Sequence, residues 1–223
     1  MGRNKRERRA RGGLTPDKFL SSGQLKKLLG WLAYQEHEAV RWGRTRPIID
    51  NFVVNLLLET GLRASELCQL NVEDLPAAHG KKAVWIRNGK GGVERTVYIG
   101  PRTVKRLKEF CERFRAGARP KEPLLLNEGG RRMGYMSIYQ KLTRIGSQVG
   151  IKLHPHMLRH TFATRLYAVK KDLRFVQDQL GHADPATTAI YAQTLPEERE
   201  ATMEEFEDQI RLIGDADPFG AQQ

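Results

Sequence analysis

Six polar residues stand where the sequence predicts the ends or turns of secondary structure, the places from which side chains most often act on a ligand. They are Arg63, Lys90, His156, Arg159, His182 and Tyr191. Arginine, lysine and histidine donate hydrogen bonds to oxyanions, and tyrosine adds a hydroxyl that can donate or accept. The residue types therefore indicate a site for an anionic group.

Two motifs place an arginine beside a feature that favours an anion. In the segment 61–67, Glu66 follows Arg63 by three residues, so both lie on one face of a helical turn and the carboxylate can fix the guanidinium. His156 and Arg159 have the same spacing just after a proline, and hence near a helix N-terminus, where the backbone also attracts an anion. Both motifs predict a clamp for oxyanions.

His182 and Tyr191 lie on either side of a predicted helix start. Gly181 ends one helix, and Asp184 followed by Pro185 is typical of an N-cap and the first residue of the next. Tyr191 then falls about two turns into that helix. His182 is expected to be held between the two helices.

Taken singly, these residues have simpler explanations. An isolated arginine such as Arg63 is usually solvated or ion-paired, and a lysine such as Lys90 is common at hairpin tips because tips are polar. His182 would most often cap a helix C-terminus, and Tyr191 would most often be a half-buried aromatic residue. Only their joint order carries information.

The histidines and cysteines do not predict a metal site. His154, His156 and His160 are spaced i, i+2 and i+6, so they do not share one helical face as a zinc pair does. Cys68 and Cys111 lie in apolar helical contexts and are expected to be unreactive buried thiols of a reducing cytoplasm.

The elements that must position these residues are mostly helices. The two segments 81–87 and 93–99 are rich in β-branched and aromatic residues and are joined by a glycine-rich turn at 88–92, which predicts a β-hairpin with Lys90 at its tip. Apolar periodicity and stop signals predict helices at about 19–34, 48–59, 62–70, 101–114, 135–149, 156–168, 172–180 and 185–193. The predicted fold class is mainly α with one small antiparallel β-hairpin.

Composition limits the classes of function. The chain has 223 residues, 39% of them hydrophobic, which suffices for one main globular domain. Its 38 lysines and arginines exceed its 26 acids, and the net charge of +12 favours a polyanionic partner, with nucleic acid the leading candidate. The longest apolar stretch, 52–58, is far too short to span a membrane, so we expect a cytoplasmic protein.

The charge is distributed unevenly along the chain. The predicted N-terminal arm, 1–14, carries six basic residues against one acid, whereas the segment 196–223 carries nine acids against two basic residues. The arm therefore contributes +5 and the acidic segment −7, which leaves +14 on residues 15–195. We expect a flexible basic arm, one catalytic domain over 15–195, and an acidic C-terminal helix and tail.

The joint order of the six residues resembles the catalytic domain of the tyrosine recombinases, the phage-integrase-type enzymes, and of their Xer-like members in particular. That family carries an arginine in a Gly-x-Arg-x-x-Glu-Leu context, a lysine on a β-hairpin, His-x-x-Arg, a histidine or tryptophan after Leu-Gly, and a tyrosine about nine residues later. The matching segments here are 61–67, 89–95, 155–164 and 180–191. The resemblance extends over about 15–195 and implies the family's fold. The family usually carries a separate core-binding domain before this point, whereas here only the basic arm precedes the first predicted helix, so no separate core-binding domain is expected.

The resemblance implies that Tyr191 attacks a DNA phosphodiester, forming a 3′-phosphotyrosyl intermediate and a free 5′-hydroxyl. His156 would accept the phenol's proton, Arg63 and Arg159 would bind the two non-bridging oxygens, and Lys90 would protonate the leaving 5′-oxygen. The phosphodiester bond energy is conserved, so the reaction needs neither ATP nor a metal, and no cofactor is expected.

The remaining roles implied by the resemblance are supporting ones. His182 would be a further donor to the phosphate, and Glu66 would orient Arg63 or a neighbouring side chain. His160 is expected to be a buried structural histidine.

The activity implied by the resemblance is site-specific DNA recombination or integration. Two alternatives stay open: DNA relaxation like that of the type IB topoisomerases, which use the same set of residues, and a non-catalytic DNA-binding regulator. An RNA-binding protein is less well supported, because no RNP-like aromatic motif is present. Expected partners are double-stranded DNA, other protomers in a DNA-induced homotetramer formed through the C-terminal helix, and accessory DNA-binding proteins. The protein is expected to associate with the nucleoid.

Overall fold

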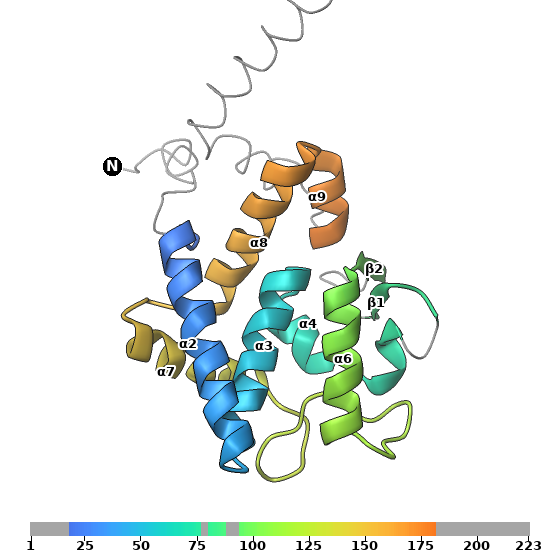
Figure 1. The fold of residues 1–223 in the computed structure, drawn as a ribbon. Helices are drawn as coiled ribbons and strands as arrows, with labels where there is room; N and C mark the ends of the chain where they lie inside the picture. The colour runs from blue at the N-terminus through green and yellow to red at the C-terminus, as the bar shows by residue number, and fades with distance from the viewer. Residues whose placement is uncertain (1–17, 77–79, 88–93, 182–223) are drawn as a thin grey trace, which may run out of the picture.

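The computed structural model describes residues 18–76, 80–87 and 94–181. Figure 1 shows a mainly helical molecule with one pair of strands, which confirms the predicted fold class. The helices and strands in chain order are α2 (Ser22–Arg41), α3 (Arg46–Thr60), α4 (Ala64–Gln69), the 3₁₀ turn η2 (Val72–Asp74), β1 (Ala83–Ile86), β2 (Arg95–Tyr98), α6 (Pro101–Phe114), α7 (Tyr135–Val149), α8 (Pro155–Lys170) and α9 (Leu173–Leu180).

Most of the predicted helices occur within a few residues of their expected bounds, and the helices 101–114 and 135–149 match theirs. The prediction for 19–34 is wrong at its C-terminal end, because α2 continues to Arg41. No glycine or proline occurs between Tyr34 and Gly43, and Ala39 extends the buried face formed by Leu28 and Leu32. The predicted helix 185–193 lies outside the described residues.

The predicted hairpin is confirmed by two short antiparallel strands. Ala83 pairs with Tyr98 and Ile86 with Arg95, so the register places the reversal at the glycine-rich segment. Along β1, Ala83, Val84 and Ile86 are buried against the core, while Trp85 faces outward. The tip of the hairpin, 88–93, lies outside the described residues.

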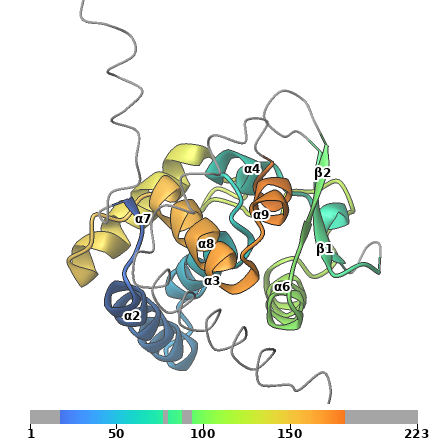
Figure 2. The same ribbon diagram turned by 90° about the horizontal axis from the view of Figure 1, so that it is seen from above.

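One large apolar core joins α2, α3, α4, α6, α7, the strands and the start of α8. In Figure 1, α2 and α3 run side by side and α8 crosses behind them. Figure 2 shows that α9 lies between α8 and the two strands. Val176 and Leu180 of α9 form a second, smaller apolar cluster with Ala163 of α8. The large core thus carries α4 and the start of α8, while α9 is held by a few contacts of its own.

Two further sequence-based expectations concern the described ranges. None of the helices in these ranges is long and apolar enough to cross a membrane. Burial raises the pKa of the Cys68 thiol to about 11, and it also raises the pKa of Cys111. Both thiols therefore stay protonated at neutral pH, as expected for unreactive cysteines.

Candidate active site

The site begins where α3 ends at Gly61. This residue has a φ of 64°, the left-handed conformation that glycine adopts without strain, and its N–H donates to Leu57 at the end of the helix. A Cβ at position 61 would also lie 2.2 Å from a ring carbon of Phe162 on α8. Glycine therefore lets the chain turn closely against α8 and deliver Arg63 as the N-cap of α4.

Glu66 holds two arginines in the buried part of the site. Arg63 donates to it through its backbone N–H (2.8 Å) and its Nη1 (2.7 Å), and Arg95 of β2 donates through Nη1 (2.7 Å) and Nη2 (2.9 Å). Glu66 is only 4% exposed. Burial on its own would raise the pKa of this carboxyl, but the bonds and charge of Arg95, together with the bonds from Arg63, lower it to about 2. Glu66 is therefore ionised at every physiological pH.

Arg159 connects the end of α3 to the end of α9. Its Nη1 donates to the Gly61 carbonyl and its Nη2 to the Leu180 carbonyl, both at 2.7 Å. Arg159 is buried, with 5% of its surface exposed. Each Nη nitrogen carries two protons, so each of these bonds uses one of them. The two bonds fix the plane of the guanidinium.

The C-terminal end of α9 accepts hydrogen bonds from Arg63, Arg95 and Arg159. Arginine side chains donate to three consecutive carbonyls: Arg95 Nε to Gln179 (3.4 Å), Arg159 Nη2 to Leu180 (2.7 Å) and Arg63 Nη2 to Gly181 (3.4 Å). The last carbonyls of a helix lack partners within the helix and carry its negative dipole end, so cations are favoured there. The Gln179 side chain also accepts from the Tyr98 N–H of β2 at 3.1 Å.

His156 lies at the other side of the same site, in the first turn of α8. A hollow of about 80 Å³ is lined by Arg63, Ala64, Ser65, Tyr135, Pro155, His156 and Arg159. A water molecule takes about 30 Å³ of liquid, so the hollow accepts a group of a few heavy atoms. Its lining includes two arginines and a histidine beside Pro155, the first residue of α8, so an anion is the favoured occupant. The structure thus brings Arg63, His156 and Arg159 together, with Glu66 behind Arg63.

The other three predicted site residues cannot be placed. Lys90, His182 and Tyr191 lie outside the described residues. In sequence, Lys90 falls between β1 and β2, and His182 follows Gly181, whose carbonyl accepts from Arg63.

Three residues of the site were not identified from the sequence: Arg95, Gln179 and Tyr135. Arg95 ends the matched segment 89–95 and starts β2, yet the resemblance implies no role for it. Its pairing with Glu66 joins positions 29 residues apart. Gln179 and Tyr135 carry no local signal, since a polar residue in the last turn of one helix and a tyrosine starting another are ordinary.

The two other histidines of α8 have structural surroundings. The His154 Nδ1 accepts from the Met157 N–H at 3.2 Å and so caps the N-terminus of α8. Burial, then the charges of His156 and Arg159, lower the pKa of His160 to about 4, so its imidazole is neutral at physiological pH. Within the described ranges, no three histidine, cysteine or acidic side chains are grouped as metal ligands.

The model of the phage integrase family matches residues 18–198, which is most of the chain. The chain belongs to the phage integrase family. The tyrosine recombinase XerA of Pyrococcus furiosus is 32% identical over 204 residues, which cover 90% of this chain and 65% of XerA. XerC of Azotobacter vinelandii is 40% identical over 144 residues, covering 64% of this chain and 47% of XerC.

Solved structures of the phage integrase family confirm the fold. The crystal structure of XerA recombinase superposes with a TM-score of 0.67 at 28% identity, covering 84% of this chain and 64% of that one. The XerH site-specific recombinase bound to its difH substrate gives 0.66 at 28% identity, covering 85% of this chain and 54% of XerH. The chain thus spans between 47% and 65% of the length of these relatives.

Proposed function

We propose that this chain is the catalytic domain of a site-specific tyrosine recombinase, which cleaves and rejoins DNA strands through a 3′-phosphotyrosyl intermediate. The observation that carries the proposal is the convergence of Arg63, Arg159 and His156 on one small hollow at the N-terminus of α8. The family relationship supplies the reaction class, because the relatives are named as tyrosine recombinases.

The arginines supply the electrostatic part of the reaction. A phosphodiester gains negative charge on its non-bridging oxygens as it is attacked, and donors that are already oriented stabilise that charge without reorganising. Glu66 and the Gly181 carbonyl hold the Arg63 guanidinium, and two backbone carbonyls hold that of Arg159, so neither guanidinium has to be ordered by the substrate. This preorganisation favours the transition state over the ground state.

The nucleophile and the proton transfers are assigned to four residues. Tyr191 would attack the scissile phosphate, with His156 accepting the phenol's proton, because a phenol of pKa near 10 is a poor nucleophile when protonated. Lys90 would donate a proton to the departing 5′-oxygen, and His182 would add a donor to the phosphate. Rejoining reverses these transfers, with a 5′-hydroxyl attacking the phosphotyrosine.

Recombination is favoured over simple DNA relaxation. The XerH neighbour is described as a site-specific recombinase bound to a defined substrate. We also propose that the protein works on double-stranded DNA in the nucleoid as a DNA-induced homotetramer, assembled through the acidic segment 196–223 and aided by accessory DNA-binding proteins. An acidic segment and a strongly basic body would attract one another across protomers.

The test is covalent trapping on nicked suicide duplexes that carry candidate target sites. The wild type should form an adduct that migrates with the DNA on a denaturing gel, and Tyr191→Phe should form none while binding DNA within a few fold. Tyr34→Phe, which alters an exposed tyrosine on α2, is the matched control and should keep full activity. A native gel of the same reactions should show complexes of four protomers with two duplexes.

Two results would contradict the proposal. An adduct that survives Tyr191→Phe would mean that another residue is the nucleophile. Cleavage that EDTA abolishes would mean that a metal ion takes part in the reaction.

A further inference from the structure

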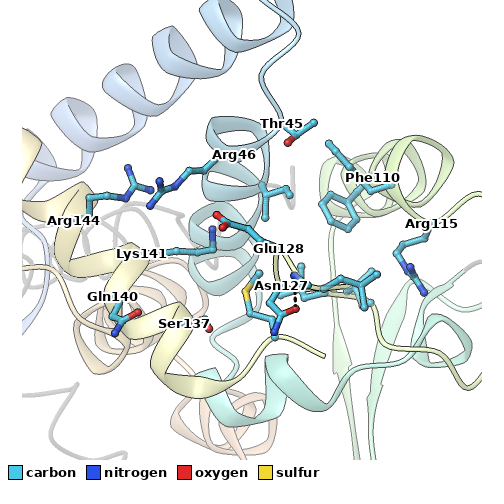
Figure 3. A pocket seen from close by; sticks show the side chains of 17 residues that line it. Thr45, Arg46, Phe110, Arg115, Asn127, Glu128, Ser137, Gln140, Lys141 and Arg144 are labelled. Atoms are coloured by element: carbon cyan, nitrogen blue, oxygen red, sulfur yellow. Dashed lines mark hydrogen bonds between the residues drawn. The ribbon is translucent and has the colours of Figure 1, made fainter. Parts of the chain in front are cut away.

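A second pocket lies at the opposite end of α3 from the candidate active site. It has a volume of about 720 Å³ and is enclosed by the start of α3, the end of α6, residues 124–133 and the exposed side of α7 (Figure 3). α3 has 15 residues and is about 22 Å long, with Arg46 at the pocket end and Gly61 at the active-site end. The two linings share no residue, although Tyr135 of the hollow stands in sequence between Met133 and Ser137 of this pocket.

The floor of the pocket is apolar and its walls are fixed. Ile49, Phe110 and Phe114 line it together with three consecutive leucines, 124–126. The ring of Phe110 packs between other aromatic rings, 3.7 Å from Phe52 and 5.0 Å from Phe114, centroid to centroid. The leucine segment is tied down because the Leu124 N–H donates to Leu70 at 2.9 Å and the Met133 N–H to Leu125 at 2.9 Å. An apolar surface is thus already formed in the folded chain.

The rim of the pocket is cationic. Its lining includes four basic side chains (Arg46, Arg115, Lys141 and Arg144) and one acid (Glu128). Buried Asp50 accepts from Lys141 at 3.0 Å and from Arg144, and Glu122 accepts from Arg115 at 2.9 Å, so these acids offset part of the charge. Arg46 is exposed and has no ion pair within the described ranges. Figure 3 shows the Arg46 and Arg144 side chains pointing toward one another, although like charges repel.

The bonding of two rim arginines is incomplete. The Nε atoms of Arg115 and Arg144 are buried and have no acceptor within the described part of the chain. The Arg115 side chain is only 10% exposed, so this donor is withdrawn from bulk solvent. A buried donor without an acceptor costs about 1–3 kcal/mol, so an acceptor brought by a ligand would be favourable here.

We propose that this pocket binds an acidic segment of a partner protein, with an apolar side chain on the leucine and phenylalanine floor and carboxylates between Arg46 and Arg144. Pockets that combine an apolar floor with a few converging polar groups are typical ligand sites, and arginine clusters recognise acidic motifs. Duplex DNA fits less well, because it is convex and has no apolar side chain to cover the floor. The site gives the protein a protein-binding surface separate from its DNA chemistry.

The proposal is tested by fluorescence anisotropy with a labelled peptide that has a central Leu-Phe pair flanked by two glutamates on each side. We expect saturable binding at physiological salt. Arg46→Glu should weaken binding about tenfold or more, since it turns an attractive charge at the rim into a repulsive one. Ser137→Phe, which fills the pocket from α7, should weaken it as strongly. Arg44→Glu makes the same charge change on an exposed residue outside the pocket and should change affinity less than twofold.

Several outcomes would overturn the proposal. They are the absence of saturable binding, an equal loss in Arg44→Glu and Arg46→Glu, and no loss when the peptide's glutamates become glutamines. Displacement of the peptide by duplex DNA from both the wild type and the Arg44 variant would identify the surface as a nucleic-acid contact instead. Arg46 makes no bond that folding depends on, so this variant remains informative if Ser137→Phe fails to fold. The measurement contains no DNA reaction, so it is independent of the proposed recombinase activity.

Discussion

Replacing Glu66 by glutamine should remove the carboxylate that holds Arg63 and Arg95 while preserving the size of the side chain. An amide offers one acceptor oxygen and an NH₂ group that cannot accept from a guanidinium. Two arginines would then share a weakened partner in a region where Glu66 is only 4% exposed. Because a buried charge that loses its partner is costly, both stability and cleavage should fall.

The magnitude follows from the pKa of Glu66. Its carboxyl falls from an ordinary value of 4.5 to about 2 in the folded protein. At 1.36 kcal/mol per pKa unit, ionised Glu66 contributes about 3 kcal/mol to the free energy of unfolding at neutral pH. Because the folded pKa is the lower one, this contribution is complete above about pH 4.5, is lost as the pH falls toward 2, and is near half its full value at about pH 3.

The assay is urea unfolding of the wild type and Glu66→Gln at pH 7, 5, 4 and 3. The excess stability of the wild type should be constant between pH 7 and 5 and should shrink below that. Glu109→Gln, which alters an exposed carboxylate paired with Lys105 on α6, is the control and should change stability by less than about 0.5 kcal/mol. An excess that stays constant from pH 7 to pH 3 would refute the reasoning, because it would show that ionisation of Glu66 is not what stabilises the fold.

Two further predictions concern the surroundings of the site. Gly61→Ala should destabilise the protein by at least about 2 kcal/mol more than Gly150→Ala: both have positive φ, but only position 61 adds a clash, with Phe162. Thermal unfolding of the two variants measures the difference, and equal losses would mean that the contact with Phe162 yields easily. Because burial lowers the pKa of His160 to about 4, the unfolded chain binds a proton there between pH 6.5 and 4 while the folded chain does not. The free energy of unfolding should therefore fall as the pH is lowered from 6.5 to 4. In urea unfolding, His160→Gln should make this dependence on pH less steep. An unchanged slope would show that His160 is not responsible.

Most helices and the hairpin could be predicted because each depends on residues that are close together in the sequence. Apolar periodicity and the glycine and proline stops predicted α6 and α7 with their observed bounds, and β-branched residues around a glycine-rich turn predicted the hairpin. The C-terminal end of α2 was missed for a related reason. After Tyr34 the residues are mostly polar, so apolar periodicity no longer indicates a helix. The backbone nevertheless stays helical as far as Arg41, just before the stop signal at Gly43.

The site was predictable only as far as its residues form local motifs. The Arg63–Glu66 pair is three residues apart, so spacing alone predicted their contact. The Arg95–Glu66 pair and the bonds of Arg159 to Gly61 and Leu180 depend on the packing of separate elements, which a single sequence does not reveal. The contact of Glu66 with Arg63 was predicted, but its contact with Arg95 was not.

The three arginine bonds at the end of α9 link the local unfolding of this helix to the binding of a phosphate. α9 has eight residues and a small apolar cluster, so the free energy needed to unfold it locally is modest. Unfolding α9 would remove the carbonyls that orient Arg63, Arg95 and Arg159. By thermodynamic linkage, an anion that binds best to the oriented arginines must in turn protect the α9 amides from hydrogen exchange. The exchange rate of one short helix, remote in sequence from Arg63, should therefore report the occupancy of the proposed phosphate site.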